Sequence, residues 1–139
     1  VLSLGVLGYK AARPLGAEKR GERTAGEWIA ARAAGRPVLI WTNISRVGWY
    51  SGAERLPMTE QTPSAPERLV EQARAWGVDY LVVNRHVDGD AEFLGLCPGL
   101  CAWAATRGAD RLRQVFETPT DPRPGRADRD RIRVFEVVR

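Results

Sequence analysis

The chain has 139 residues, a length that suits one domain with a substantial core. Hydrophobic residues make up 44% of it and charged residues 27%, which is ordinary for a globular protein. The net charge is +4, but its arginines alternate with acidic residues, as in RADRDRIR. A nucleic-acid-binding surface requires a basic stripe with stacking aromatic rings, so we expect no nucleic-acid partner.

The first nine residues, VLSLGVLGY, carry no charged side chain and are followed by Lys10 and Arg13. Nine residues are far fewer than the ~20 of a transmembrane helix, and the segment lacks the basic start of a signal peptide. Two interpretations stay open, a buried N-terminal segment or the truncated end of a membrane helix or juxtamembrane segment. We therefore divide the chain into residues 1–16 and a single α/β domain at residues 17–139.

The first predicted helix covers residues 24–35. Thr24 and Glu27 have the spacing of a capping box, and Gly35 is placed to end the helix. Its apolar face is formed by Ala25, Trp28, Ile29 and Ala33. The segment PVLIWT then predicts a buried strand, NISRVGWYSG a short helix or turn, and AERLPM a strand that Pro57 restricts to an edge or an end of the sheet.

The same order repeats in residues 62–83. Ser64 is the expected N-cap of a second helix, Pro66 lies in its first turn and Gly77 ends it. Its buried stripe is predicted to be Leu69, Val70, Ala73 and Trp76. The segment VDYLVV that follows is apolar on both faces, which is typical of a central parallel strand covered by helices on both sides.

The last third contains weaker patterns and then a clear hairpin. EFLGL and GLCAWAATRG predict short helices, the second closed by Gly108. RLRQVFET and RIRVFEVV predict two antiparallel strands joined by the long polar connection PTDPRPGRADRD. The whole pattern predicts a three-layer, Rossmann-like α/β domain with a small, mostly parallel sheet, helices on both faces and an antiparallel C-terminal hairpin.

Polar residues follow both of the buried strands. Ligands of open parallel sheets bind outside the carboxyl ends of the strands. The candidate ligand-binding residues are therefore Asn43, Ser45, Arg46, Asn84, Arg85 and His86, beside Trp49 and Tyr50. They could form a pocket for a sugar or a phosphate. They could equally cap the next element or face solvent, and both interpretations stay open.

The sequence contains no catalytic motif. It has no glycine-rich phosphate loop and no Gly-x-Ser-x-Gly elbow, and nothing orients His86 as a base. Cys97 and Cys101 are separated by three residues, whereas a redox motif has two between its cysteines. The chain contains one histidine, which is too few further ligands for a zinc site. We expect small buried thiols, whose pairing stays open, and a polar turn rather than a calcium loop at VDGDAE. We predict no catalytic residue, no metal and no cofactor.

Several segments in order carry a family resemblance, namely AGEWIA, GWYSGAERLP, PERLVEQARAWGVDYLVV and RIRVFEVV. Together they resemble the C-terminal extracytoplasmic domain of bacterial polytopic membrane glycosyltransferases (GT-C) of the protein-mannosyltransferase and aminoarabinose-transferase kind. The matching positions cover about residues 20–138 and are Trp28-Ile29, the turn at 49–52, Pro57, residues 77–83 and residues 133–135. CPGLCAWAATRG has no counterpart in the pattern.

The resemblance implies a domain outside the bacterial cytoplasmic membrane. In this family a sugar moves from a polyprenyl-phosphate carrier to an acceptor, and the catalytic acid lies between membrane helices that this chain lacks. The domain would then be non-catalytic, pack over the membrane active site and aid acceptor selection. Its partners would be the membrane-embedded part of the same parent chain and the polyprenyl-phosphate sugar or the acceptor. Structural roles are expected for Trp28, Tyr50, Gly52, Gly77 and Tyr80.

Two other functions stay open. The first is a free-standing α/β domain that binds a nucleotide or sugar phosphate at the carboxyl ends of its parallel strands. The second is an interaction module that uses exposed aromatic residues such as Trp41 or Trp103.

Overall fold

The computed structural model describes residues 17–119 and 131–139. The predictions for residues 1–16, and for most of the connection inside the hairpin, lie outside the described residues. The elements in chain order are α2 (Ala17–Ala33), β1 (Leu39–Thr42), α3 (Ser45–Ser51), β2 (Glu54–Pro57), α4 (Pro66–Ala75), β3 (Tyr80–Val83), α5 (Arg85–Asp88), α6 (Leu100–Ala105), β4 (Leu112–Glu117) and β5 (Arg133–Val137).

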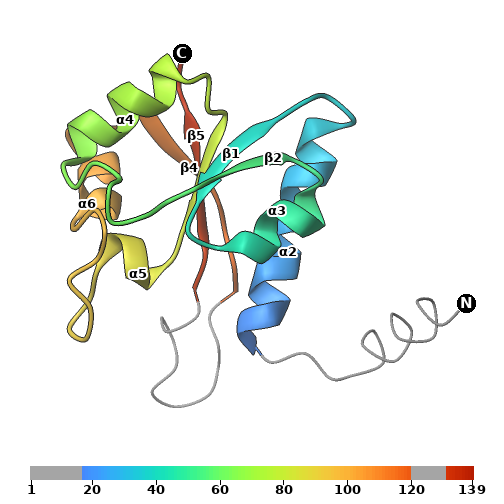
Figure 1. Cartoon of the computed structure of the whole chain (residues 1–139), viewed down its shortest axis with the longest axis horizontal. Coiled ribbons are helices and arrows are strands. Elements are labelled where there is room, and N and C mark those ends of the chain that lie inside the picture. Colours follow the sequence, from blue (N-terminus) through green and yellow to red (C-terminus); the bar gives the residue numbers. More distant parts are fainter. Residues whose placement is uncertain (1–16, 120–130) are drawn as a thin grey trace, which may run out of the picture.

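One five-stranded sheet holds the domain together, with the strand order β2-β1-β3-β5-β4 (Figure 1). Strand β1 pairs in parallel with β2 and β3, whereas β5 is antiparallel to both β3 and β4. Only β5 therefore runs against the other strands. The mostly parallel sheet, the central position of YLVV, the edge strand ending at Pro57 and the antiparallel C-terminal hairpin are all confirmed.

Helices cover both faces of the sheet, which confirms the three-layer prediction. On one face, α2 and α3 contribute Ala25, Ile29 and Val47 to a core with Tyr80 and Val82 of β3. On the other face, α4, α5 and α6 pack over Leu81 and Val83. Successive side chains of β3 alternate between the two cores, and all four are buried because each face is covered. Among the described residues, no helix has both the length and the apolarity to cross a membrane.

The start of α2 differs from the prediction. The helix begins at Ala17, so Thr24 lies inside it rather than at its cap. The Thr24 hydroxyl donates to the carbonyl oxygen of Arg20 at 2.7 Å, the bond that a threonine inside a helix makes. The preceding residues, AEKRGER, include good helix formers that extend the helix upstream. Gly35, at φ 82°, follows the end of α2 as expected.

Helix α4 also begins differently. Its N-cap is Ala65, which has no side-chain cap, so the predicted Ser64 cap is wrong; Pro66 occupies the first turn as expected. Leu69, Val70 and Ala73 are buried, but Trp76 is 50% exposed. Trp76 lies just past the last turn, where its ring rests on Trp41 with centroids 5.0 Å apart.

The predicted helix at EFLGL is wrong, whereas the one in GLCAWAATRG is confirmed as α6. This helix ends at Ala105 with Thr106 as its C-cap, so the predicted closure by Gly108 is wrong. The carboxylate of Asp90 accepts hydrogen bonds from the backbone N–H groups of Glu92 and Phe93, at 2.8 and 2.9 Å. This Asx-type turn satisfies the backbone locally and replaces a helix. Gly95 then lies so close to the Val87 carbonyl that a Cβ would collide with it, which fixes the loop against α5.

Candidate functional site

The parallel pairing of β1 and β3 brings the two predicted polar segments to one edge of the sheet. Thr42 lies opposite Val82, so Asn43 and Asn84 come next to each other although they are 41 residues apart. The side-chain amide of Asn43 donates to Oδ1 of Asn84 at 2.8 Å. Oδ1 of Asn84 also accepts the backbone N–H of His86 at 3.0 Å, which makes Asn84 the N-cap of α5.

Thr42 fixes the same edge from within. Its buried hydroxyl donates to the carbonyl oxygen of Val82 at 2.7 Å and accepts the backbone N–H of Ile44 at 3.0 Å. Oδ1 of Asn43 is buried and has no hydrogen-bond partner. The hydrogen bonds of Thr42, Asn43 and Asn84 therefore join the two strand ends to each other.

Ser45 and Arg46 are the first two residues of α3, and both are exposed. Arg46 points toward α2, where its Nε lies 4.0 Å from a carboxylate oxygen of Glu22. Within residues 17–119 and 131–139, neither Ser45 nor Arg46 makes a polar contact with Asn84, Arg85 or His86. The structure brings Asn43 and Asn84 together and leaves Arg46 with α2.

Arg85 and His86 belong to a compact cluster around the ring of Phe93. The guanidinium carbon of Arg85 lies 4.5 Å from the ring centroid, and the His86 ring lies 4.3 Å from it. Arg85 also reaches Asp90 at 3.6 Å and Glu92 at 3.4 Å. Its positive charge is therefore balanced by two carboxylates of its own loop.

The acidic residues near Arg85 also have hydrogen-bond partners within the protein. The backbone N–H of Glu92 holds the pKa of Asp90 below its usual value, helped by the N–H of Phe93 and the charge of Arg85. Asp88 accepts the backbone N–H of Cys101 at 2.8 Å. The described residues contain no group of three or more side chains that could hold a metal ion.

The two cysteines follow α5 and are free thiols. Cys97 is buried and Cys101 is half-buried, and burial is the main cause that raises the pKa of each thiol to about 12. The negative charge of Asp88 acts in the same direction on both. Both groups therefore stay protonated at neutral pH and are poor nucleophiles.

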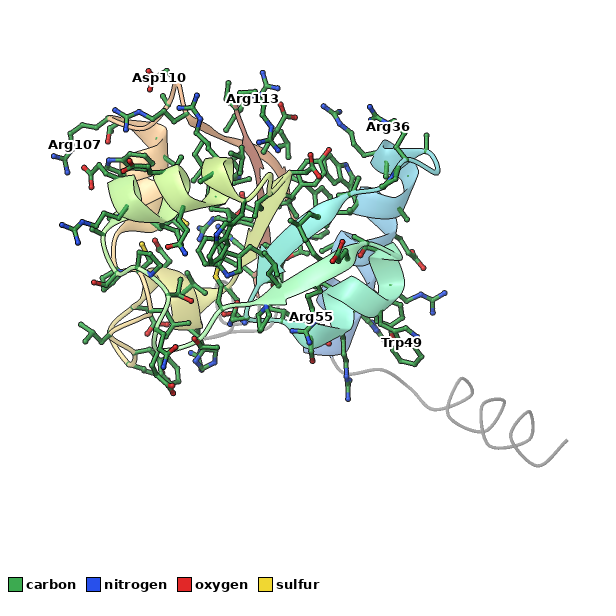
Figure 2. The ribbon with its side chains drawn as sticks, turned by 45° about the horizontal axis from the view of Figure 1, so that its top comes forward. Arg36, Trp49, Arg55, Arg107, Asp110 and Arg113 are labelled. Atoms are coloured by element: carbon green, nitrogen blue, oxygen red, sulfur yellow. The ribbon has the colours of Figure 1, made fainter. Side chains whose placement is uncertain are left out.

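The residues with expected structural roles lie mainly between α2, α3 and the sheet. Trp28 stacks on Phe116 with centroids 5.2 Å apart and meets Tyr80 edge-on at 6.2 Å. Tyr50 stacks on Trp49 at 5.6 Å, and Trp49 itself is 73% exposed (Figure 2). Gly52 ends α3 at φ 67°, and Gly77 follows α4 at φ 74°.

Gly26 was missed by sequence reasoning. A Cβ at this position would collide with Cβ of Tyr50, so the glycine lets α2 and α3 approach closely. A lone glycine inside a helical pattern is the signal that points to such a contact.

Trp41 and Trp103 do not form an exposed interaction surface. They are 2% and 4% exposed and belong to the core on the α4 side of the sheet. The indole of Trp41 donates to the Pro57 carbonyl at 3.2 Å, and that of Trp103 donates to Glu67 at 3.0 Å. Among residues 17–119 and 131–139, the exposed large apolar side chains are instead Trp49, Trp76 and Leu94.

A hollow of about 510 Å³ lies beside α4, at a place that the sequence did not single out. Its lining residues are Thr62, Pro63, Ser64, Ala65, Arg68 and Gln72. The loop that forms it follows β2 and starts at the same sheet edge as Asn43, because the N–H of Met58 donates to the Thr42 carbonyl at 2.8 Å. Strand β2 therefore adds a third polar loop to the predicted edge of the sheet. The polar segment TEQTPS after β2 was the signal in the sequence that could have pointed to it.

These features define an open α/β sheet covered on both faces, with polar loops at the carboxyl ends of its parallel strands. The same fold is found in the C-terminal globular domain of an oligosaccharyltransferase from Archaeoglobus fulgidus, with a TM-score of 0.54. The similarity covers 90% of this chain and 99% of that domain at 8% sequence identity. At this level of identity, the similarity shows a shared fold and nothing more. No protein-family model matches the sequence, and no curated protein matches it either.

Proposed function

We propose that this domain is the non-catalytic, extracytoplasmic C-terminal part of a bacterial membrane glycosyltransferase that uses a polyprenyl-phosphate sugar donor. The observation that carries the proposal is the similarity of the fold to the archaeal oligosaccharyltransferase domain over nearly the full length of both. The domain packs over the membrane active site and aids selection of the acceptor. Its main partner is the membrane-embedded part of the same parent chain.

The sequence next to the domain supports a membrane-proximal position. The uncharged segment VLSLGVLGY is followed by Lys10 and Arg13, shortly before α2. Long basic side chains at the end of an apolar segment extend to the membrane–water interface on either side of a membrane. In the proposal, α2 is therefore the element that connects the domain to the membrane part.

The contacts at the carboxyl edge support an accessory role. Thr42, Asn43 and Asn84 bond to one another or to the backbone, and Arg85 is neutralised by Asp90 and Glu92. A nucleophile and a base within hydrogen-bond reach would be needed for covalent chemistry. The polar groups of this edge instead hold loops in fixed positions, which suits a domain that shapes a partner's active site.

Cell fractionation tests the proposal. An antiserum raised against the purified chain should detect, in the cells that produce the protein, a species much larger than 15.4 kDa in the membrane fraction. Protease added outside intact spheroplasts should remove the epitope, while a cytoplasmic marker protein survives. A species of about 15.4 kDa in the soluble fraction would overturn the proposal.

The role in acceptor selection has its own test. Removing residues 17–139 from the parent chain should abolish transfer to the acceptor and leave membrane insertion of the remainder unchanged. Full transfer by the truncated parent would leave the location intact and refute the role in acceptor selection.

A further inference from the structure

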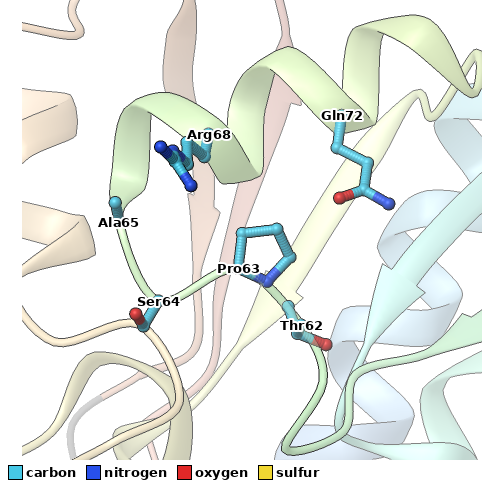
Figure 3. Close-up of a pocket in the computed structure, with 6 residues that line it drawn as sticks. All are labelled: Thr62, Pro63, Ser64, Ala65, Arg68 and Gln72. Atoms are coloured by element: carbon cyan, nitrogen blue, oxygen red, sulfur yellow. The ribbon is translucent and has the colours of Figure 1, made fainter.

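The hollow beside α4 is built from a rigid loop and one face of a helix. Figure 3 shows Arg68 and Gln72 on α4, with Pro63 and Thr62 of the preceding loop opposite Gln72. The N–H of Thr62 donates to the Thr59 carbonyl at 3.0 Å, and the Thr62 hydroxyl accepts the N–H of Thr59 at 2.9 Å. The loop is therefore fixed by its own hydrogen bonds, and the hollow, at about 510 Å³, has the size of a small-molecule site.

The polar side chains of the hollow have unused hydrogen-bonding capacity. In the part of the chain that the structure describes, the side chains of Ser64, Arg68 and Gln72 make no hydrogen bond or ion pair. They differ in this from Asn84 and Arg85, whose polar atoms bond within the protein. A hydroxyl, an amide and a guanidinium together offer donors and acceptors to a ligand in the hollow.

The charge of the hollow favours an anion. Of the six lining residues in the described part of the chain, Arg68 is the charged one and none is acidic. The neighbouring Glu67 is turned away, because its carboxylate accepts the indole N–H of Trp103 at 3.0 Å. The hollow also lies at the N-terminal end of α4, where the helix dipole adds to the positive potential.

The apolar part of the lining limits the ligand further. Among the described residues that line the hollow, Pro63 and Ala65 are the apolar ones and none is aromatic. A nucleobase would find no ring to stack on, and an acyl chain would find no extended apolar wall. A small ligand with several hydroxyl groups and one negative charge matches the hydroxyl, amide and guanidinium groups of the lining.

We propose that this hollow binds an anionic monosaccharide unit, with its carboxylate or phosphate on Arg68 and its hydroxyl groups on Ser64 and Gln72. This site goes beyond the proposed function and does not depend on it, because binding is a property of the purified chain. A sugar acid and a sugar phosphate both combine hydroxyl groups with a negative charge, which is the chemistry that the hollow recognises. Separate titrations distinguish the two ligands.

The experiment is a titration of the ¹⁵N-labelled 139-residue chain followed by NMR. Glucuronate, glucose 6-phosphate, uncharged glucose and inorganic phosphate are added separately. We expect saturable shifts of backbone amides in residues 62–72 with at least one of the two anionic sugars, and at least tenfold weaker binding of glucose and of inorganic phosphate. Added salt should weaken the binding, since Arg68 is exposed to solvent.

Matched variants locate the site. Arg68→Gln should weaken binding of the anionic sugar at least tenfold, and Gln72→Ala should weaken it about threefold. Arg74→Gln is the control, because Arg74 is an exposed arginine of the same helix that does not line the hollow. Retention of the remaining amide signals in each spectrum shows that the variant is folded.

Four results would overturn the site. One is the absence of saturable shifts with both anionic sugars. Another is equal binding of inorganic phosphate and glucose 6-phosphate, which would mean recognition of the anion alone. The third is equal loss of binding in Arg68→Gln and Arg74→Gln. The fourth is a set of shifts centred on Asn43 and Asn84 instead of residues 62–72. Fractionation tests the proposed function separately, so failure of one proposal can be distinguished from failure of the other.

Discussion

Replacing Asn84 by alanine tests whether the carboxyl edge is primarily a structural joint. Oδ1 of Asn84 accepts two hydrogen bonds, from the Asn43 amide at 2.8 Å and from the His86 backbone N–H at 3.0 Å. Alanine removes both. It also leaves the Asn43 side chain without any partner in the protein, because its Oδ1 is already buried and unpaired.

The expected cost follows from these contacts. Each hydrogen bond contributes about 1 kcal/mol net, and the unpaired Asn43 amide adds to the loss, so Asn84→Ala should lower the free energy of unfolding by about 2–3 kcal/mol. For a domain of this length, about 1 kcal/mol corresponds to roughly 3–5 °C in Tm. His86 is exposed, so His86→Ala should cost only about 0.5 kcal/mol.

Urea unfolding followed by tryptophan fluorescence measures these differences. Asn84→Asp is the matched control, because a carboxylate oxygen can accept both hydrogen bonds, and its loss should be below that of alanine. In a double-mutant cycle, Asn43→Ala and Asn84→Ala should couple by about 1 kcal/mol. An Asn84→Ala variant as stable as the unsubstituted domain would refute the structural interpretation. The predicted ligand-binding role would then be the better explanation, and loss of ligand binding in both Asn84→Ala and His86→Ala would test it.

Two further predictions concern packing and pH. Gly26→Ala should destabilise the domain by about 1–2 kcal/mol, since the clash with Tyr50 outweighs the gain of about 1 kcal/mol in helix propensity; an increase in the urea midpoint would show that α2 and α3 are not in close contact. The folded-state pKa of about 12 for Cys97 and Cys101 lies above that of an unfolded thiol, so folding binds these protons more tightly. Stability should therefore be unaffected by these thiols below about pH 8.5 and should fall as the pH rises from there toward 12. Urea midpoints measured from pH 7 to 10.5 should show this decline, and a Cys97→Ala/Cys101→Ala variant that declines as steeply would contradict it.

Local patterns predicted the fold well where one segment decides its own structure. YLVV is apolar at every position, and only a strand covered on both faces satisfies that pattern. Gly35 and Gly77 lie just past their helices with positive φ, a conformation that costs glycine little. These features depend on neighbours in the sequence and could be predicted without the fold.

Helix starts and tryptophan exposure were predicted less well, because each depends on context. Thr24 and Ser64 have the side chains of N-caps, but α2 already begins at Ala17 and α4 begins at Pro66 after an Ala65 cap. Trp41 and Trp76 both follow apolar patterns, yet one is 2% exposed and the other 50%. The difference arises because Trp41 lies within the sheet, whereas Trp76 lies beyond the last turn of its helix.

For the candidate sites, the local pattern showed that polar residues follow the strands, and the geometry of parallel strands places such residues on one edge. Which of these residues contact one another depends on the folded arrangement. The register of β1 and β3 joins Asn43 to Asn84 across 41 residues, while the orientation of α3 directs Arg46 to α2. The hollow at Arg68 likewise arises where the loop after β2 folds against α4. Contacts between segments far apart in the chain depend on strand register and helix orientation, and no local pattern specifies those.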